Sequence, residues 1–134
     1  MNDNAPLTPP VVLVMDRDPF IQSDIDMTLH EVMPDAMVHL CSDTAAAASL
    51  IDTLEPLSLA VLRLMRHDRL DPRLPRRAAA RGARVLLLGD PIDLGKGDGS
   101  EAQIADDRIA VLPVPFSAGT FRAALAELGF PAFS

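Results

Sequence analysis

The sequence predicts an α/β fold in which a five-stranded parallel sheet is covered by helices on both faces, and three observations lead to this prediction. Five short apolar runs alternate along the chain with segments that have the periodicity or the capping residues of helices. Several of these runs, such as "VVLVM", are apolar without interruption, which is typical of strands buried on both sides. Strands that alternate with helices form right-handed crossovers, and such crossovers build a parallel sheet.

The expected strands follow from these apolar runs. They are "VVLVM" (11–15), "AMVHLCS" (36–42), "LSLAVLRLM" (57–65), "ARVLLLG" (83–89) and "RIAVLPV" (108–114).

The first expected helix begins with Asp18 as N-cap and Pro19 at the first helical position, and it ends before Pro34. Its inward stripe is Ile21, Ile25, Leu29 and Val32. Ser42 or Asp43 caps the second helix, and Ser117 caps the last. Two shorter helices are expected, one within 71–82 and one at about 100–105 after a loop rich in Gly and Asp.

The length of 134 residues predicts one domain. We expect a disordered tail at 1–10, the domain at 11–129 and a short tail at 130–134. The chain has no apolar run long enough to span a membrane and no secretory signal, so a cytoplasmic protein without membrane contact is expected. We expect the single cysteine, Cys41, to be a small core residue.

The charge is distributed unevenly. Residues 1–62 carry ten acids and one arginine, whereas residues 63–84 carry eight arginines and two aspartates. The net charge of −7 and the lack of Trp and Tyr argue against nucleic-acid binding. The basic segment is either a docking face for an acidic partner, including a second copy of the chain, or a solvated outer face. Its candidate docking residues are Arg66, Arg69, Arg73, Arg76, Arg77 and Arg81.

In a parallel α/β sheet, ligands bind beyond the carboxyl ends of the strands. The residues at these ends are therefore the candidate site, and they are Asp16, Arg17, Asp18, Ser42, Asp43, Arg63, Gly89, Asp90, Val114 and Pro115. The three histidines have no metal-ligand spacing, and "LGKGDGS" lacks the spacing of a phosphate-binding loop.

The segments "VLVMDRDP", "LAVLRLM", "RRAAARGARVLLLGD" and "VPFSAGTFRAALAEL" resemble the receiver domains of bacterial two-component response regulators, over about Val11 to Leu128. The resemblance implies a flavodoxin-like (CheY-like) three-layer sandwich with strand order 2-1-3-4-5. It also implies a commonly cis Val114–Pro115 bond.

The resemblance also shows what has changed at the site. Asp16 matches the first acid of the family's magnesium-binding pair, but Arg17 stands at the second acid and Arg63 at the phospho-acceptor aspartate. Gly89 stands at the family's hydroxyl position and Val114 at its lysine, while Pro115 is retained and Asp18 reads as a helix cap.

Arginine is no nucleophile for phosphoryl transfer, and guanidinium groups repel Mg²⁺, which needs oxygen ligands. We therefore expect no metal, no cofactor and no enzymatic activity at this place. Arg63 is expected either to form an ion pair with Asp16 or to extend to solvent from the strand end.

These residues predict a stand-alone receiver-like (pseudo-receiver) domain that acts through an unidentified protein partner, or as a homodimer, without phosphorylation. One alternative is a domain that binds an anionic small molecule through Arg17 and Arg63. Another is a phospho-acceptor elsewhere, such as Asp68, which requires a longer third strand.

Overall fold

The structure is a computed structural model that describes residues 9–54, 56–63, 73–89, 108–113 and 116–130. In chain order its elements are β1 (Val11–Met15), α1 (Pro19–Val32), β2 (Met37–Cys41), α2 (Thr44–Thr53), β3 (Leu59–Arg63), α3 (Arg73–Ala80), β4 (Arg84–Gly89), β5 (Ile109–Pro113) and α5 (Ala118–Glu127). None of the described helices is long and apolar enough to cross a membrane.

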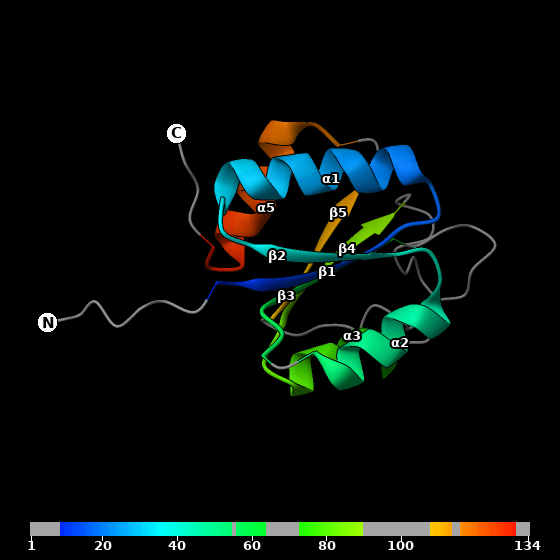
Figure 1. The fold of residues 1–134 in the computed structure, drawn as a ribbon. Helices are drawn as coiled ribbons and strands as arrows, with labels where there is room; N and C mark the ends of the chain where they lie inside the picture. The colour runs from blue at the N-terminus through cyan, green and yellow to red at the C-terminus, as the bar shows by residue number, and fades with distance from the viewer. Residues whose placement is uncertain (1–8, 55, 64–72, 90–107, 114–115, 131–134) are drawn as a thin grey trace, which may run out of the picture.

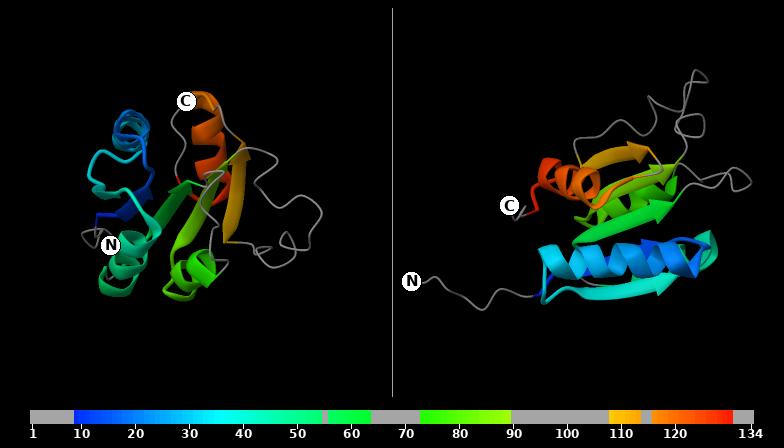
Figure 2. Two further views of the ribbon diagram at one scale, coloured as in Figure 1. Left: turned by 90° about the vertical axis from the view of Figure 1, so that its right-hand side faces the viewer. Right: turned by 90° about the horizontal axis from the view of Figure 1, so that it is seen from above.

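The strands form one sheet in the order β2-β1-β3-β4-β5, and all four pairings are parallel. Helices α1 and α5 cover one face of the sheet, and α2 and α3 cover the other (Figure 1). The same three layers are seen when the molecule is turned (Figure 2). The predicted fold class and the strand order that the family resemblance implied are both confirmed.

The central strand β1 separates two apolar cores by simple alternation. Val12 and Val14 point to the core under α1 and α5, whereas Leu13 and Met15 point to the core under α2 and α3. The strand can be apolar throughout because both faces of the sheet are covered.

Capping residues fix where the helices begin. The Asp18 carboxylate accepts a hydrogen bond from the Phe20 amide at 2.9 Å, and the Asp43 carboxylate accepts one from the Ala46 amide at 2.7 Å. Ser117 and Thr120 form a capping box at the start of α5. The three sequence-based cap predictions thus agree with the structure, and Asp43 takes the cap that the sequence left open between Ser42 and Asp43.

The described segments differ from the sequence-based boundaries in small ways. Strand β2 is one residue shorter at each end than expected, because Ser42 already lies in a bend and Ala36 is not part of the strand. Phe130, which we expected in the carboxyl-terminal tail, packs against the core under α1 and α5, and its amide donates to the Leu125 carbonyl. The helix expected at 100–105 lies outside the described residues.

Replacing Phe121 with alanine should lower the free energy of unfolding by about 3–5 kcal/mol, because it leaves a cavity where a fully buried ring packs 5.5 Å from the Phe116 ring centroid. Urea unfolding followed by far-ultraviolet circular dichroism measures the loss. Ala123→Ser, at an exposed position of the same helix, is the control and should change the stability by less than about 0.5 kcal/mol. Equal effects of the two variants would contradict the assigned core.

Candidate functional site

The candidate site lies where β1 and β3 end side by side. In the parallel register of these strands, Met15 is opposite Leu62, so the next residues, Asp16 and Arg63, emerge at the same edge of the sheet. Asp16 belongs to the turn that leads into α1, and Arg63 is the last residue of β3. Two residues that are 47 positions apart in sequence are brought together by strand pairing alone.

The Asp16 carboxylate has both oxygens hydrogen-bonded within the protein. Its Oδ1 accepts from the Asp18 amide at 2.8 Å, and its Oδ2 accepts from Nη1 of Arg63 at 3.1 Å. The side chain of Asp16 is fully buried, whereas that of Arg63 is 18% exposed. A buried carboxylate needs a compensating charge, and Arg63 supplies it, so of the two alternatives that the sequence left open for Arg63 the ion pair is the one present.

Gln22 is a site residue that the sequence analysis missed. Its side-chain amide donates to the backbone carbonyls of Asp16, at 2.5 Å, and of Cys41, at 2.9 Å, and so joins the carboxyl ends of β1 and β2 to the first turns of α1. The sequence held a signal for this role, because Gln22 stands three residues before Ile25 and is thus a polar residue beside the inward stripe of the helix.

The other predicted site residues are only partly brought together. Arg17 is exposed in the same turn as Asp16, and it takes part in an interaction within the protein. Gly89 ends β4 and is buried, with Pro113 of β5 opposite it. Residues Asp90, Val114 and Pro115 lie outside the described part, as does the expected cis bond between the last two.

The groups gathered here are a poor set of ligands for a divalent cation. Mg²⁺ requires several oxygen ligands in octahedral geometry, and the described side chains offer one buried carboxylate with a guanidinium 3.1 Å from it. No cluster of three or more metal-ligating side chains occurs anywhere in the described residues. The repulsion between a dication and the neighbouring guanidinium would oppose binding further.

The Arg63 side chain contains a buried hydrogen-bond donor that no described residue accepts from. Its Nε is buried and has no hydrogen-bond partner among the described residues. A buried donor without a partner is unfavourable, and it makes the site better suited to an additional anion or polar oxygen than to a cation.

Arginines of the predicted docking patch are partly engaged inside the fold. Arg77 forms a two-pronged ion pair with Asp52 of α2, in which its Nε lies 2.8 Å from the carboxylate, and Arg81 donates to the Leu54 carbonyl at 3.3 Å. Arg76 of α3 is exposed. Arg66 and Arg69 lie outside the described residues, as does the side chain of Arg73. Arg77 of α3 and Arg81 just after it therefore tie this segment to the end of α2, and the charge of Arg77 is partly neutralised by Asp52.

Cys41 is buried at the end of β2, and nothing about it indicates a reactive thiol. Burial raises its pKa to about 11, and the nearby charge of Asp43 contributes to the increase. Since the thiolate is the reactive form, the thiol is unreactive at neutral pH, as expected for a core residue.

A double-mutant cycle should detect the ion pair in the stability of the protein. Arg63→Met leaves the buried Asp16 carboxylate without its counter-charge and should lower the free energy of unfolding by about 2–4 kcal/mol. Asp16→Asn keeps the shape of the side chain and should lower the free energy of unfolding by less. The double variant should lose less free energy of unfolding than the two single variants lose together. Additive losses in urea unfolding would show that the two charges do not interact.

The comparisons with known proteins agree on the fold alone. No protein-family model matches the sequence, and no curated protein sequence matches it either. Among solved structures, a response regulator receiver protein from Sinorhizobium medicae aligns with a TM-score of 0.70 and 16% identity, over 91% of this chain and 95% of that chain.

Two further structures are similar in the same way. A response regulator receiver protein from Burkholderia phymatum has a TM-score of 0.68 and 21% identity, over 92% of this chain and 98% of that chain. A CheY-like response regulator receiver domain protein from Methanospirillum hungatei has a TM-score of 0.69 and 15% identity, over 90% of this chain and 93% of that chain. The sheet order, the two helical layers and these matches together assign to this chain the CheY-like receiver fold of response regulators.

Proposed function

We propose that this protein is a receiver-like signalling domain that acts through contact with a partner protein and does not undergo aspartyl phosphorylation. The observation that carries the proposal is the ion pair between Arg63, at the end of β3, and the buried Asp16. The proposal includes that the domain is not an enzyme and needs no metal or cofactor.

The chemistry of the pair supports the loss of phosphoryl transfer. The reaction needs a carboxylate nucleophile and a cation that bridges it to the phosphoryl oxygens. At the end of β3 the chain carries a guanidinium, which cannot attack phosphorus. The remaining acid, Asp16, has its two oxygens occupied by the Asp18 amide and by Arg63.

The same pair supports a role that does not depend on phosphorylation. A fixed internal cation beside Asp16 neutralises this edge of the sheet permanently, where a metal ion would do so only when bound. Gln22 adds rigidity because it ties α1 to the ends of β1 and β2. A domain held in one state by its own side chains can present a constant surface to a partner, which is what a scaffold or adaptor requires.

Acetyl phosphate or beryllofluoride with Mg²⁺ should leave the protein unmodified, because the one buried carboxylate of the site is paired with Arg63 and too few oxygen ligands are present to hold Mg²⁺. Intact-mass spectrometry and amide NMR spectra measure the outcome for the whole chain. A stable phosphoryl adduct on any aspartate, including Asp68, would contradict the proposal.

Arg63→Asp is the matched control for this experiment. It places a second carboxylate beside Asp16, so Mg²⁺ at millimolar concentration should raise the melting temperature of this variant by roughly 3–6 °C, corresponding to about 1 kcal/mol. The melting temperature of the wild-type protein should not respond to Mg²⁺. An equal response of both proteins would place the metal somewhere other than at this site.

A second candidate function is the binding of an anionic small molecule at the same strand ends. The buried Nε of Arg63, which has no partner among the described residues, favours it, and Arg17 adds a second cation in the same turn. The ligand class would be phosphorylated or carboxylated metabolites, held by charge-assisted hydrogen bonds.

A thermal-shift series separates the two candidates. If an anion binds here, inorganic phosphate or a sugar phosphate should raise the melting temperature, and Arg63→Met should abolish the shift because it removes the donors. Arg76→Met, at an exposed position outside the site, is the control and should leave the shift unchanged. No shift with any phosphorylated compound would eliminate this second function.

The partner and the oligomeric state belong to the proposal as well. The surface on the α5 side, around Phe116 to Gly129, is the proposed dimer contact if the domain forms homodimers. On that side Arg122 of α5 forms an ion pair with Glu31 of α1, which holds the two helices together and leaves fewer charges for a second copy. The arginines of α3 are the alternative contact for an acidic partner protein.

A further inference from the structure

The open edge of β2 has backbone groups that point away from the sheet. β2 is the terminal strand, and its only neighbour among the described strands is β1. The Met37 amide donates to the Pro10 carbonyl and the Cys41 carbonyl accepts from the Asp16 amide, so the backbone groups at these alternate positions face β1. In a parallel pair the intervening residues point the other way, so the N–H and C=O groups of Val38 and Leu40 face the open side.

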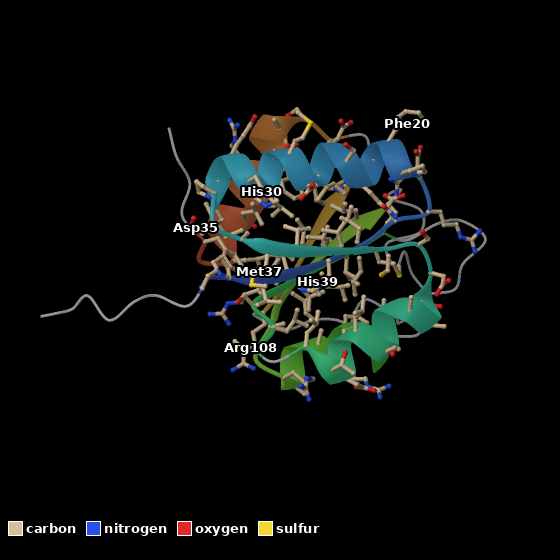
Figure 3. All side chains as sticks on the ribbon, viewed as in Figure 1. Phe20, His30, Asp35, Met37, His39 and Arg108 are labelled. Carbon is tan, nitrogen blue, oxygen red and sulfur yellow. The ribbon has the colours of Figure 1, made fainter. Side chains whose placement is uncertain are left out.

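In the described part of the chain, this edge lacks several of the common features that prevent pairing with another strand. Natural edge strands carry lysines, prolines or bulges, but Met37–Cys41 contains no proline and no lysine, and it pairs with β1 in regular register. Met37 is 54% exposed and Leu40 is 44% exposed, and they lie on opposite faces of the sheet because they are an odd number of residues apart. Figure 3 shows Met37 and His39 along this uncovered strand.

Acidic residues stand at both ends of the strand. Asp35 precedes β2 and Asp43 follows it, and both are exposed. Residues 1–62, which include β1, β2, α1 and α2, carry ten acids and one arginine. The edge is therefore apolar in the middle and negative at its ends.

The charges argue against a second copy of the chain as the occupant. If two β2 strands paired antiparallel about His39, Asp35 of one copy would lie opposite Asp43 of the other, and the same contact would occur twice. In parallel pairing each acid would lie beside its own counterpart. Like charges directly opposite one another are destabilising. Lysines and arginines of a different partner, placed opposite Asp35 and Asp43, would instead be attracted to them.

We propose that the edge of β2 binds an extended segment of a partner protein, which adds a sixth strand to the sheet. The segment has apolar side chains in the middle, which cover Met37 and Leu40, and lysines or arginines at both ends, which face Asp35 and Asp43. Main-chain hydrogen bonds to Val38 and Leu40 provide the affinity, and the flanking charges select the sequence. This inference rests on the proposed role in partner binding and names the surface and the chemistry of the partner.

Synthetic peptides test the inference on the full chain. A fluorescein-labelled peptide of nine residues, with valines in the middle and lysines and arginines at both ends, should bind in fluorescence anisotropy titrations. Its amide NMR shift changes should be largest at 37–41. The same peptide with glutamates in place of its lysines and arginines should bind at least about tenfold more weakly.

Two kinds of variant assign the contact to the edge. Leu40→Pro removes an outward N–H but no hydrogen bond to β1, so it should weaken binding at least tenfold, while Leu40→Ala, which keeps the N–H, should weaken it less. Asp35→Asn together with Asp43→Asn should weaken it by about threefold to tenfold, and asparagine still caps α2. Far-ultraviolet circular dichroism verifies that each variant is folded.

Several results would overturn the inference. These are equal binding of the acidic and basic peptides, shift changes centred away from β2, unchanged affinity in folded Leu40→Pro, and a dimer in sedimentation experiments that Leu40→Pro dissociates. The last result would assign the edge to a second copy. The outcome is distinct from that of the phosphorylation experiment: absence of peptide binding in an unmodified protein refutes only this surface, whereas a phosphoryl adduct refutes the proposed function whatever the peptides do.

Discussion

The parallel pairing of β1 with β3 is the constraint on which the candidate site depends. It aligns the ends of two strands that are far apart in sequence, and it leaves the buried Asp16 facing Arg63. A carboxylate with no exposed surface is tolerated only when its charge is compensated and its oxygens are hydrogen-bonded. The structure meets both conditions with an arginine and a backbone amide, and the same turn then delivers Asp18 to cap α1.

The pair and the edge strand are linked through the backbone. The Asp16 amide donates to the Cys41 carbonyl, and Gln22 donates to the same carbonyl from α1. The carboxyl end of β2 is thus held by the residues that build the site, so a segment added to β2 would lie one strand away from Asp16. The candidate site and the edge of β2 are thus connected by the hydrogen bonds that the Asp16 amide and the Gln22 side chain donate to the Cys41 carbonyl.

The arginine-rich segment shows how charge counted along a sequence can differ from charge available at a surface. In the described part, Arg77 and Arg81 bind groups at the carboxyl-terminal end of α2, and Arg84 donates to the Leu128 carbonyl at 3.1 Å. These contacts join elements that are 25 to 44 residues apart, as their partners' numbers show. Part of the basic segment therefore links elements within the fold, two of its arginines inside the α2–α3 layer and Arg84 between the sheet and the end of α5, and less of it remains for a partner.

The sequence by itself determined the fold class, the strands and the helix starts, because these depend on local patterns. Continuous apolar runs predict buried strands, and Asp18 and Ser117 are capping residues whose preference needs no tertiary context, whereas the sequence left the second cap open between Ser42 and Asp43. The family resemblance added the strand order. Position along the strands was sufficient to expect Asp16 and Arg63 at one edge.

Only the tertiary structure decided which partners those side chains take. The sequence marks Gln22 only as a polar residue beside the inward stripe of a helix, and its hydrogen bonds to the ends of β1 and β2 appear only in the folded structure. The pairing of Arg77 with Asp52 depends likewise on how α3 packs beside α2. Which edge of β2 is open depends on β1 being its sole described neighbour. The physical reason is common to all three: hydrogen bonds and ion pairs between distant elements depend on ångström-scale placement, which apolar periodicity does not encode.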